Sequence, residues 1–440
     1  MNKFDDDFFE VLNENPKLYA KDFLNAREKA KNSNAYYHGE VVPFLLHPMF
    51  WSEEDISAFR EIALMIAGIT DRLTDLYLDN REIRELFGFP EALENLILRE
   101  KGYASNAPIG RYDLFYNSPK DFRFCEINTD GSSAMNEDNE LGGILKQSLA
   151  LKNYEEHFNL KLENFELIDS WVDKLLSYYE EWGGRKTPNV AICDFIESGT
   201  SAEFEVFKRA MENRGLSCVI CDPRDTVFKN GKLFYKGERI DLLYRRIVTF
   251  ELLEKIDEIP DFIKAYMNNA MCTVGEIRSQ LMHHKKSFEV LEKLSLLNAF
   301  SKKERDFIGE HFPKTETLTD NKSLIQRVIE DKDKFVIKPY DKNASQGVFI
   351  GKDTDKADWE FLVGTYKGTG YLAQNFIEPY ERLLTVFEGE KAKRHSFKTV
   401  VGLFLYGGKF QGLFTRGSEK LLISGIKDSV TLPNFLVREQ

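Results

Sequence analysis

Two short strand-like segments near residue 120 constrain this chain more than any other feature. Residues 111–116 and 122–128 combine apolar and polar side chains in strand-like runs, and a polar stretch containing proline, 117–120, separates them. Two such runs joined by a short turn sequence predict a β-hairpin. The hairpin matters because of the charged side chains that it would bring together.

Those side chains are Arg111 and Asp113 on the first strand and Glu126 and Asn128 on the second. Residues two apart on a strand share a face, so the two pairs can converge on one spot. Clustered carboxylate and amide oxygens suit Mg²⁺ held together with nucleotide phosphates, and an adjacent arginine suits a phosphoryl group in transfer. The alternative is a solvated polar face on which Arg111 pairs with Glu126 across the strands.

Composition narrows the class of protein. A chain of 440 residues is long enough for two or three domains, and its net charge of −12 argues against a general nucleic-acid binder. Five cysteines in this length do not make a disulfide scaffold. The N-terminus lacks signal-peptide features, and no apolar run approaches the length of a membrane span. We therefore expect a cytoplasmic protein with neither a nucleic-acid nor a membrane partner.

The pattern along the chain predicts an α/β protein that begins with a helical segment and continues with alternating strands and helices. We expect five parts: a helical segment (1–100), a core part carrying the hairpin (101–187), a Rossmann-like βαβ unit (188–275), a lid (276–385) and a return to the core (386–440). Within the lid, residues 276–298 read as one helix, and in the last part residues 421–424 read as a strand.

Two places are candidates for substrate contact. Ser132 and Ser133 lie in a small polar loop after the hairpin, where a turn or helix cap is the alternative. Arg245 and Arg246 end an apolar strand, where an arginine can receive a substrate carboxylate. An internal salt bridge is the equal alternative for these arginines.

The second informative stretch lies some 200 residues after the hairpin. A strand over 334–339 ends in Lys338-Pro339, a loop over 341–347 contains a glycine, and 371–377 runs from apolar to polar and back at Gln374. A lysine opposite a glycine-containing loop suits phosphate oxygens, with backbone N–H groups forming an anion nest. The change of polarity at Gln374 suits an adenine between two sheets.

Together, the Arg-x-Asp and Glu-x-Asn strands, the Lys-Pro strand, the glycine loop and the Gln-Asn-Phe-Ile segment resemble the circularly permuted ATP-grasp ligases. The synthetase domain of glutathionylspermidine synthase is the most similar, over about residues 101–440. In ordinary ATP-grasp chains the lysines precede the metal-binding strand, and here that order is inverted. Four motifs in this unusual order are more specific than any one of them.

The resemblance implies a role for each matching residue. Asp113, Glu126 and Asn128 match the ligands of two Mg²⁺ ions, and Arg111 and Arg416 match arginines near the γ-phosphate and the acyl phosphate. The expected ATP contacts are Lys285, Lys338, the loop residues Ser345, Gln346 and Gly347, and the adenine segment Gln374, Asn375, Phe376 and Ile377. Lys286 is a competing alignment for Lys285. The loop Asn343-Ala344-Ser345-Gln346-Gly347 departs from the Gly-Arg-Glu-Gly pattern common in the family.

The implied activity is ATP-dependent ligation of a carboxylate to an amine through an acyl phosphate, with ADP and phosphate as by-products. The partners would be a small-molecule or peptide carboxylate and an amine; the resemblance specifies neither substrate, nor the oligomeric state. Two alternatives stay open: a kinase that uses the same nucleotide grip, and a nucleotide-binding module without catalysis.

Overall fold

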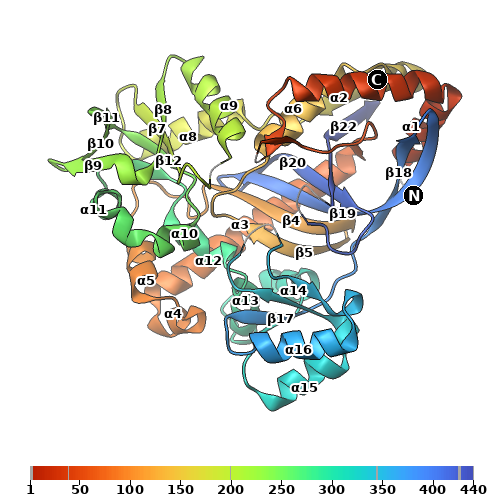
Figure 1. Cartoon of the computed structure of the whole chain (residues 1–440). Helices are drawn as coiled ribbons and strands as arrows, with labels where there is room; N and C mark the ends of the chain where they lie inside the picture. The colour runs from red at the N-terminus through yellow and green to blue at the C-terminus, as the bar shows by residue number, and fades with distance from the viewer. Residues whose placement is uncertain (1–2, 38, 199, 343–344, 425–427, 440) are drawn as a thin grey trace.

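A six-stranded antiparallel sheet at the centre of the molecule carries the predicted hairpin (Figure 1). The computed structural model describes residues 3–37, 39–198, 200–342, 345–424 and 428–439. In this central sheet the strand order is β21-β20-β19-β4-β5, with β18 also paired to β19. The strands are β4 (Ile109–Ser118), β5 (Asp121–Asn128), β18 (Glu381–Glu388), β19 (Lys391–Tyr406), β20 (Lys409–Ser418) and β21 (Val430–Leu432).

The hairpin prediction is confirmed, including its register. Arg111 lies opposite Asn128, and Asp113 lies opposite Glu126. Directly opposed residues of an antiparallel pair share a face, so all four side chains are on one side of the sheet. Immediately after this pair the register shifts, because Leu114 faces Phe124 and Cys125 is an extra residue in β5. This β-bulge ends the run of shared faces next to the polar cluster.

A separate four-stranded parallel sheet follows in the chain, in the order β13-β12-β7-β8. β7, the first of these strands in the chain, pairs with β8 on one side and with β12 on the other, so the strand order reverses between β7 and β12. Ligands of open parallel sheets bind outside the carboxyl ends of the strands at such a reversal. The strands are β7 (Asn189–Cys193), β8 (Ser217–Cys221), β12 (Leu242–Arg245) and β13 (Cys272–Val274), with a small antiparallel sheet of β9 (Thr226–Lys229), β10 (Lys232–Tyr235) and β11 (Glu238–Ile240) beside them.

A third sheet, in the order β14-β17-β15-β16, occupies the region predicted as a lid. It packs with its helices around the buried Trp359 and Val363, in a small core of its own. Figure 1 places this unit below the central sheet. The strands are β14 (Thr315–Thr317), β15 (Phe335–Pro339), β16 (Phe349–Ile350) and β17 (Tyr371–Asn375), and the helices are α15 (Lys322–Glu330) and α16 (Lys356–Tyr366).

Two predicted elements are wrong in detail. The single helix expected over 276–298 is interrupted after α12 (Gln280–His283), and it resumes as α13 (Ser287–Leu296). At the interruption the backbone N–H of Lys285 donates to the carbonyl of Tyr340 (3.0 Å) instead of to a helical partner. Residues 421–424 form no strand in the described part of the chain, and residues 421–423 line a cavity described below.

The first hundred residues are mainly helical, as expected, but they also contribute strands. β3 (Met49–Trp51) pairs in parallel with β22 (Asn434–Glu439), which in turn pairs with β6 (Leu160–Asn164). The N-terminal and C-terminal ends of the chain are therefore joined in one small sheet. The first helices are α1 (Lys3–Glu14), α2 (Pro16–Lys31), α3 (Glu53–Asp79), α4 (Arg81–Phe87) and α5 (Glu91–Leu98), with β1 (Tyr36–Tyr37) and β2 (Glu40–Val41) between α2 and β3.

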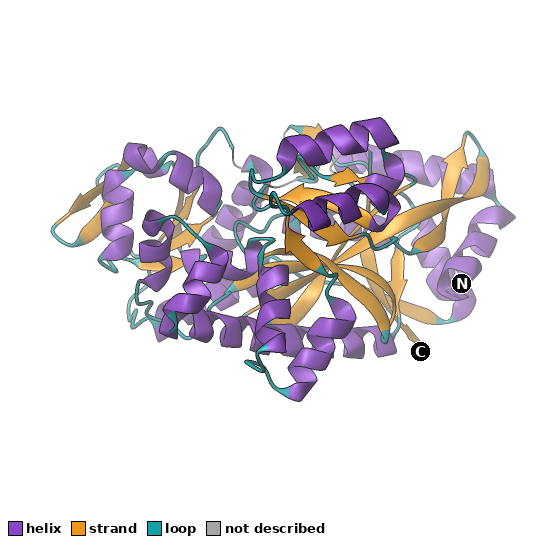
Figure 2. Ribbon diagram, turned by 90° about the horizontal axis from the view of Figure 1, so that it is seen from below, coloured by secondary structure: helices purple, strands orange, loops and turns teal. Residues whose placement is uncertain are grey.

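Seen from below, a large group of strands lies near the centre of the molecule with helices around it, and smaller groups lie towards its left and right ends (Figure 2). α3 begins at a capping box formed by Ser52 and Asp55 and lies along the central sheet through its apolar face. None of the helices in the described residues has the length and apolar character of a membrane span. The other helices are α6 (Met135–Lys146), α7 (Leu149–Phe158), α8 (Asp169–Glu181), α9 (Ser201–Glu212), α10 (Thr249–Glu254), α11 (Pro260–Met267) and α14 (Lys302–His311).

A buried ion pair joins the central and the parallel sheets. Arg245, at the end of β12, pairs with Asp130 in the loop after the hairpin at 2.5 Å, and both side chains are almost fully buried. The second carboxylate oxygen of Asp130 accepts from the backbone N–H of Thr249 (2.5 Å) at the start of α10. Arg245 also donates to the carbonyls of Ile247 and Gly275. The pair therefore fixes the loop after the hairpin against the parallel sheet.

We expect Arg245→Met to lower the free energy of unfolding by about 3–5 kcal/mol, because it leaves the buried Asp130 carboxylate without its cation. A urea titration followed by circular dichroism measures the change. Arg239→Met is the matched control, since Arg239 pairs with Asp241 (2.8 Å) and its side chain is 45% exposed; it should cost less than about 1 kcal/mol. Equal losses in the two variants would contradict the role given to the buried pair.

Candidate functional site

Two adjoining cavities lie where the three sheets meet. The polar cavity, of about 370 Å³, lies between the hairpin, the loop after it and the carboxyl ends of β7 and β12. The lid cavity, of about 110 Å³, lies between the hairpin and the lid sheet. Glu126, Ser345 and Arg416 line both cavities, so the two spaces are joined through these residues.

Most of the predicted site residues line one of these cavities. The lid cavity is lined by Asp113, Glu126, Lys285, Lys338, Ser345, Gln374, Asn375, Phe376, Ile377 and Arg416. The polar cavity is lined by Arg111, Glu126, Asn128, Ser132, Ser133, Arg246, Ser345, Gln346 and Arg416. Arg245 and Gly347 line neither, and Asn343 and Ala344 of the predicted loop lie outside the described residues. The hairpin and the Lys-Pro strand thus face one another, while the role of each residue stays a prediction.

Arg111 forms its ion pair with Asp113, not with Glu126. Its guanidinium donates to both oxygens of that carboxylate, at 2.7 and 3.1 Å, and also to the carbonyl of Ser133 (3.0 Å). The amide of Asn128 donates to the same carboxylate (3.2 Å), and Arg416 approaches it to 3.6 Å from β20. One buried carboxylate is therefore surrounded by two arginines and an amide.

This arrangement needs a glycine on β19, the strand between β4 and β20. Gly402 of β19 lies opposite Asp113, and a Cβ atom there would be 2.7 Å from Cδ of Arg111 and 2.8 Å from Oδ1 of Asp113. Such distances are shorter than packed atoms adopt, so any larger residue would displace the ion pair. The bare backbone at Gly402 lets the Arg111 side chain lie across β19.

Glu126 pairs with Lys285, whose ammonium lies 2.8 Å from the carboxylate. Burial acts to raise the pKa of Glu126, but Lys285, together with Lys338 and His283, outweighs burial and holds that pKa at about 2. The Lys285 ammonium also donates to the carbonyl of Lys342 (2.7 Å), at the root of the predicted phosphate loop. The neighbouring Lys286 points elsewhere and donates to the carbonyl of Phe87 (3.2 Å). Of the two alternative lysines, Lys285 is the one in the cavity.

Lys338 reaches the hairpin from the lid. Its side chain is buried and donates to the carbonyl of Cys125 (3.3 Å), the bulged residue of β5. Burial lowers the pKa of Lys338, because no carboxylate in the described residues lies within ion-pair distance of it. An anion in the lid cavity would supply the missing partner charge.

The opposite wall of the lid cavity is apolar. Val336 and Ile350 of the lid contribute to it, together with Ile423 from the segment after β20. At its edge the amide of Gln374 donates to the hydroxyl of Thr315 (2.7 Å), which joins β17 to β14. An apolar slot with a few fixed polar groups is typical of a site for a planar ring.

The donor set at the hairpin fits Mg²⁺. Asp113 and Glu126 offer carboxylate oxygens and Asn128 an amide oxygen, and Mg²⁺ is usually held by one or two carboxylates with phosphate oxygens and water completing the octahedron. The described residues contain no cluster of three or more histidine, cysteine, aspartate or glutamate ligands. Protein side chains of the described residues therefore do not fill the coordination sphere of Mg²⁺ at the hairpin by themselves, and phosphate oxygens would supply the remaining ligands.

The two strand-end arginines have different surroundings. Arg245 has the internal salt bridge that was the alternative for it, and it lies outside the polar cavity, so the structure does not support a substrate contact there. Arg246 lines the cavity, although it also pairs with Glu203 of α9 at 2.7 Å. Adjacent strand residues point to opposite faces, which explains why only one of the two reaches the cavity.

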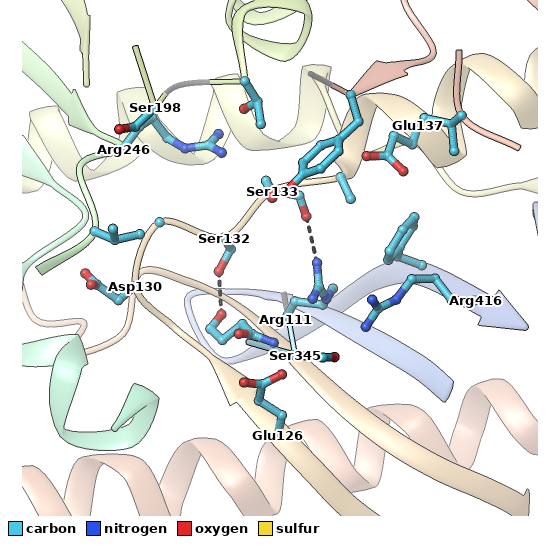
Figure 3. Close-up of a pocket in the computed structure, with 18 of the residues that line it drawn as sticks. Arg111, Glu126, Asp130, Ser132, Ser133, Glu137, Ser198, Arg246, Ser345 and Arg416 are labelled. Atoms are coloured by element: carbon cyan, nitrogen blue, oxygen red, sulfur yellow. Dashed lines mark hydrogen bonds between the residues drawn. The ribbon is translucent and has the colours of Figure 1, made fainter. Parts of the chain in front are cut away.

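The predicted serines both belong to the wall of the polar cavity. The hydroxyl of Ser132 donates to the carbonyl of Asn128, which closes the loop onto the end of the hairpin. Ser133 contributes its carbonyl to Arg111, as described above. Figure 3 shows both residues near the middle of the cavity wall, with Arg111 and Arg416 on one side and Asp130 and Arg246 on the other.

Several residues of the polar cavity were not foreseen from the sequence. Glu137 lies in the first turn of α6, Asp194 follows β7, and Tyr37 comes from the N-terminal segment, for which no site residue was expected. Burial raises the pKa of Asp194 to about 7. Asp194 could have been found from the rule that ligands bind at a reversal of strand order, but only with the order of the strands in hand.

Comparison of the sequence with family models and with curated proteins gives no match. Among solved structures, a glutathione synthetase-like effector (GSS30) from Globodera pallida, in its apo form, matches over 96% of this chain and 97% of its own, with a TM-score of 0.62 and 12% identity. The chain has the fold of that protein. At this coarse level the α/β prediction is confirmed.

Two other matches are partial. D-alanyl-alanine synthetase A from Vibrio cholerae covers 58% of this chain and 90% of its own, with a TM-score of 0.32 and 10% identity. The macrocyclase MdnC from Microcystis aeruginosa, bound to the precursor peptide MdnA, covers 56% and 90%, with a TM-score of 0.31 and 11% identity. At these TM-scores, neither match adds to the assignment of the fold.

The two neighbouring lysines offer a test of the lid cavity. We expect Lys285→Met to weaken the binding of a non-hydrolysable ATP analogue with Mg²⁺ by about 2 kcal/mol, roughly thirtyfold in Kd, because a charged donor is lost. Lys286→Met should bind as the parent does. Isothermal titration calorimetry measures both, and a loss of affinity in Lys286→Met equal to that in Lys285→Met would contradict the placement of the nucleotide.

Proposed function

We propose that the protein is an ATP-dependent ligase that joins a carboxylate to an amine through an acyl phosphate. The observation that carries this proposal is the junction of the two cavities at Glu126, Ser345 and Arg416. One cavity has the apolar wall and buried cations that suit a nucleotide, and the other is polar and larger. A γ-phosphate at the junction would meet a substrate held in the polar cavity.

The residues of the lid cavity suit ATP in that orientation. The apolar wall beside Gln374 would take the adenine, while Lys338 and Lys285 would take phosphate oxygens. The hairpin oxygens of Asp113, Glu126 and Asn128 would hold Mg²⁺, one or two ions, at the phosphates. When bound, the metal would offset the charge that develops on the transferring phosphoryl group.

The protein itself would act by position and charge. Arg111 and Arg416 point to the junction from two strands of a rigid sheet, so they would stabilise the charge of the phosphoryl group in transfer and of the acyl phosphate afterwards. The carboxylate substrate would lie between the arginines and the loop at Ser132. No nucleophilic side chain is required in this scheme.

Two further proposals concern the fold. We infer that the chain has the ATP-grasp elements in permuted order, with the metal-binding hairpin before the lid, and that the parallel sheet is a Rossmann-like unit. The order of the hairpin, β4–β5, ahead of the Lys-Pro strand, β15, supports the first inference. The four parallel strands with a reversal between β7 and β12 support the second.

The direct test is an assay of the purified protein with ATP, Mg²⁺ and a panel of carboxylates (amino acids, dipeptides and tripeptides) combined with a panel of amines (amino acids and diamines). ADP release is followed by a coupled assay, and the products by mass spectrometry. A ligase gives ADP together with a product heavier by the amine minus water. A stable phosphoester would identify a kinase, and ATP binding without turnover would identify a binding module.

For the carboxylate–amine pair found in that panel, Glu126→Gln should lower turnover by a factor of 100 or more, roughly the loss of about 3 kcal/mol of electrostatic stabilisation at the phosphates. Far-ultraviolet circular dichroism should be unchanged. Glu381→Gln is a matched control, because Glu381 pairs with Lys398 on the exposed edge of the central sheet. Full ADP release by Glu126→Gln would refute the metal assignment.

A further inference from the structure

Glu137 is a buried carboxyl group that the scheme above does not use. It lies in the first turn of α6, is 6% exposed and lines the polar cavity. In Figure 3 its carboxyl group points into the cavity on the same side as Arg416. The structure gives it no salt bridge within the described residues, and the Thr431 hydroxyl is its side-chain hydrogen-bond partner.

Every charged group that faces Glu137 is already engaged. Arg111 holds Asp113 at 2.7 Å, and Arg416 approaches that same carboxylate at 3.6 Å. Glu203 pairs with Arg246 and accepts from the N–H of Met135 at the start of α6 (2.8 Å). Two further neighbours, Tyr37 across the cavity and Asp138 on the same helix, add no cation. The Glu137 carboxyl therefore faces the cavity with no cation of the described residues at ion-pair distance, and Arg111 and Arg416 act on it from farther away.

These surroundings give Glu137 and Glu126 different pKa values. Burial, and next the negative charge of Glu203, raise the pKa of Glu137 to about 7, whereas Lys285 holds that of Glu126 at about 2. Two carboxyl groups whose environments separate their pKa values in this way are suited to different tasks. A group that exchanges its proton near neutral pH suits general acid–base catalysis.

Two other carboxyl groups of the polar cavity, Asp130 and Asp194, are less well placed for this task. Asp130 is bound by Arg245 and by the backbone of Thr249. Asp194 accepts from the N–H of Phe195 (2.9 Å) at the end of the parallel strand β7, away from the arginines of the central sheet. Glu137 is the carboxyl group whose electrostatic partners include both Arg111 and Arg416.

We propose that Glu137 receives the protonated amine of the second substrate in the polar cavity and accepts its proton before the nitrogen attacks the acyl phosphate. This rests on the ligase function proposed above. It assigns the amine a defined place, next to the junction of the two cavities. It also makes the amine substrate one that arrives as a primary ammonium ion.

The step balances in atoms and charge. The ammonium group gives one proton to the Glu137 carboxylate, and the freed lone pair forms the C–N bond to the acyl carbon. The C–O bond to the phosphate then breaks, and its electron pair leaves with the phosphate. The second nitrogen proton goes to the departing phosphate, so the products are the amide, hydrogen phosphate and the protonated Glu137. Release of that proton to solvent restores the carboxylate.

Hydroxylamine is the probe that isolates this step. It is largely neutral at neutral pH, so it attacks an acyl phosphate without a proton acceptor and leaves a hydroxamate that ferric iron detects. For the carboxylate found in the assay above, Glu137→Gln should lower amide formation by about 100-fold or more, the range of a lost general base. Hydroxamate formation with ATP should stay within about threefold of the parent protein.

The pH profile gives a second readout. Because the carboxylate form is the active one, amide formation by the parent protein should fall as the pH drops through about 7, the pKa of Glu137. That acid limb should be missing from the residual activity of Glu137→Gln. Glu137→Asp keeps a proton acceptor and should recover part of the amide formation.

The outcomes separate the two proposals. If the parent protein forms no hydroxamate with any carboxylate of the panel, the ligase function fails and the role of Glu137 with it. If hydroxamate forms but Glu137→Gln keeps full amide formation, or loses both products equally, only the role of Glu137 is overturned. Glu140→Gln, which changes an acid of the same helix that lies outside the cavity, is the matched control. Calorimetric binding of the ATP analogue verifies that each variant is folded.

Discussion

The site depends on buried cations and carboxylates that are packed closely around Gly402 of β19, a position without a side chain. Arg111, Arg416, Lys285 and Lys338 approach the junction of the two cavities, where Asp113 and Glu126 are the opposing carboxylates. The four cations come from the central sheet, the break between α12 and α13, and the lid. Gly402 of β19 leaves the space that the ion pair of Arg111 and Asp113 occupies. Because cations exceed carboxylates there, the fold holds a positive charge that a polyphosphate would neutralise.

The sequence predicts those parts of the site in which residues close together in the chain determine the secondary structure and the face on which each side chain lies. The strand-like runs 111–116 and 122–128 predict the hairpin and the shared face of its polar residues, since both follow from the period of a strand. The strand that ends in Lys338-Pro339 is also predictable locally, from its run of apolar residues. What pattern could not supply is the bulge at Cys125, to which Lys338 donates, because a bulge depends on how two strands meet.

Choices between adjacent residues needed the tertiary structure. Arg245 and Arg246 must point to opposite faces, but which face meets the cavity depends on the packing of β12 against the rest of the molecule. Lys285 enters the cavity because the helix stops there, and its N–H bonds to Tyr340 of the lid. The run at 421–424 resembles a strand in sequence, yet it forms no strand in the described chain, and its residues 421–423 line the lid cavity instead.

Glu137 shows why an acidic helix is hard to interpret from sequence. In composition, the first turn of α6 looks like a solvated, dipole-favourable start of a helix. It is buried because segments distant in the chain pack against it: the Asn136 amide donates to the carbonyl of Asn34, and Glu137 hydrogen-bonds with Thr431 of β21. Burial raises the pKa of Glu137 to about 7, while Lys285 beside Glu126 helps to hold the pKa of Glu126 at about 2. Composition alone does not reveal this difference. Two carboxyl groups of the same residue type therefore acquire different chemistry from the segments that fold around them.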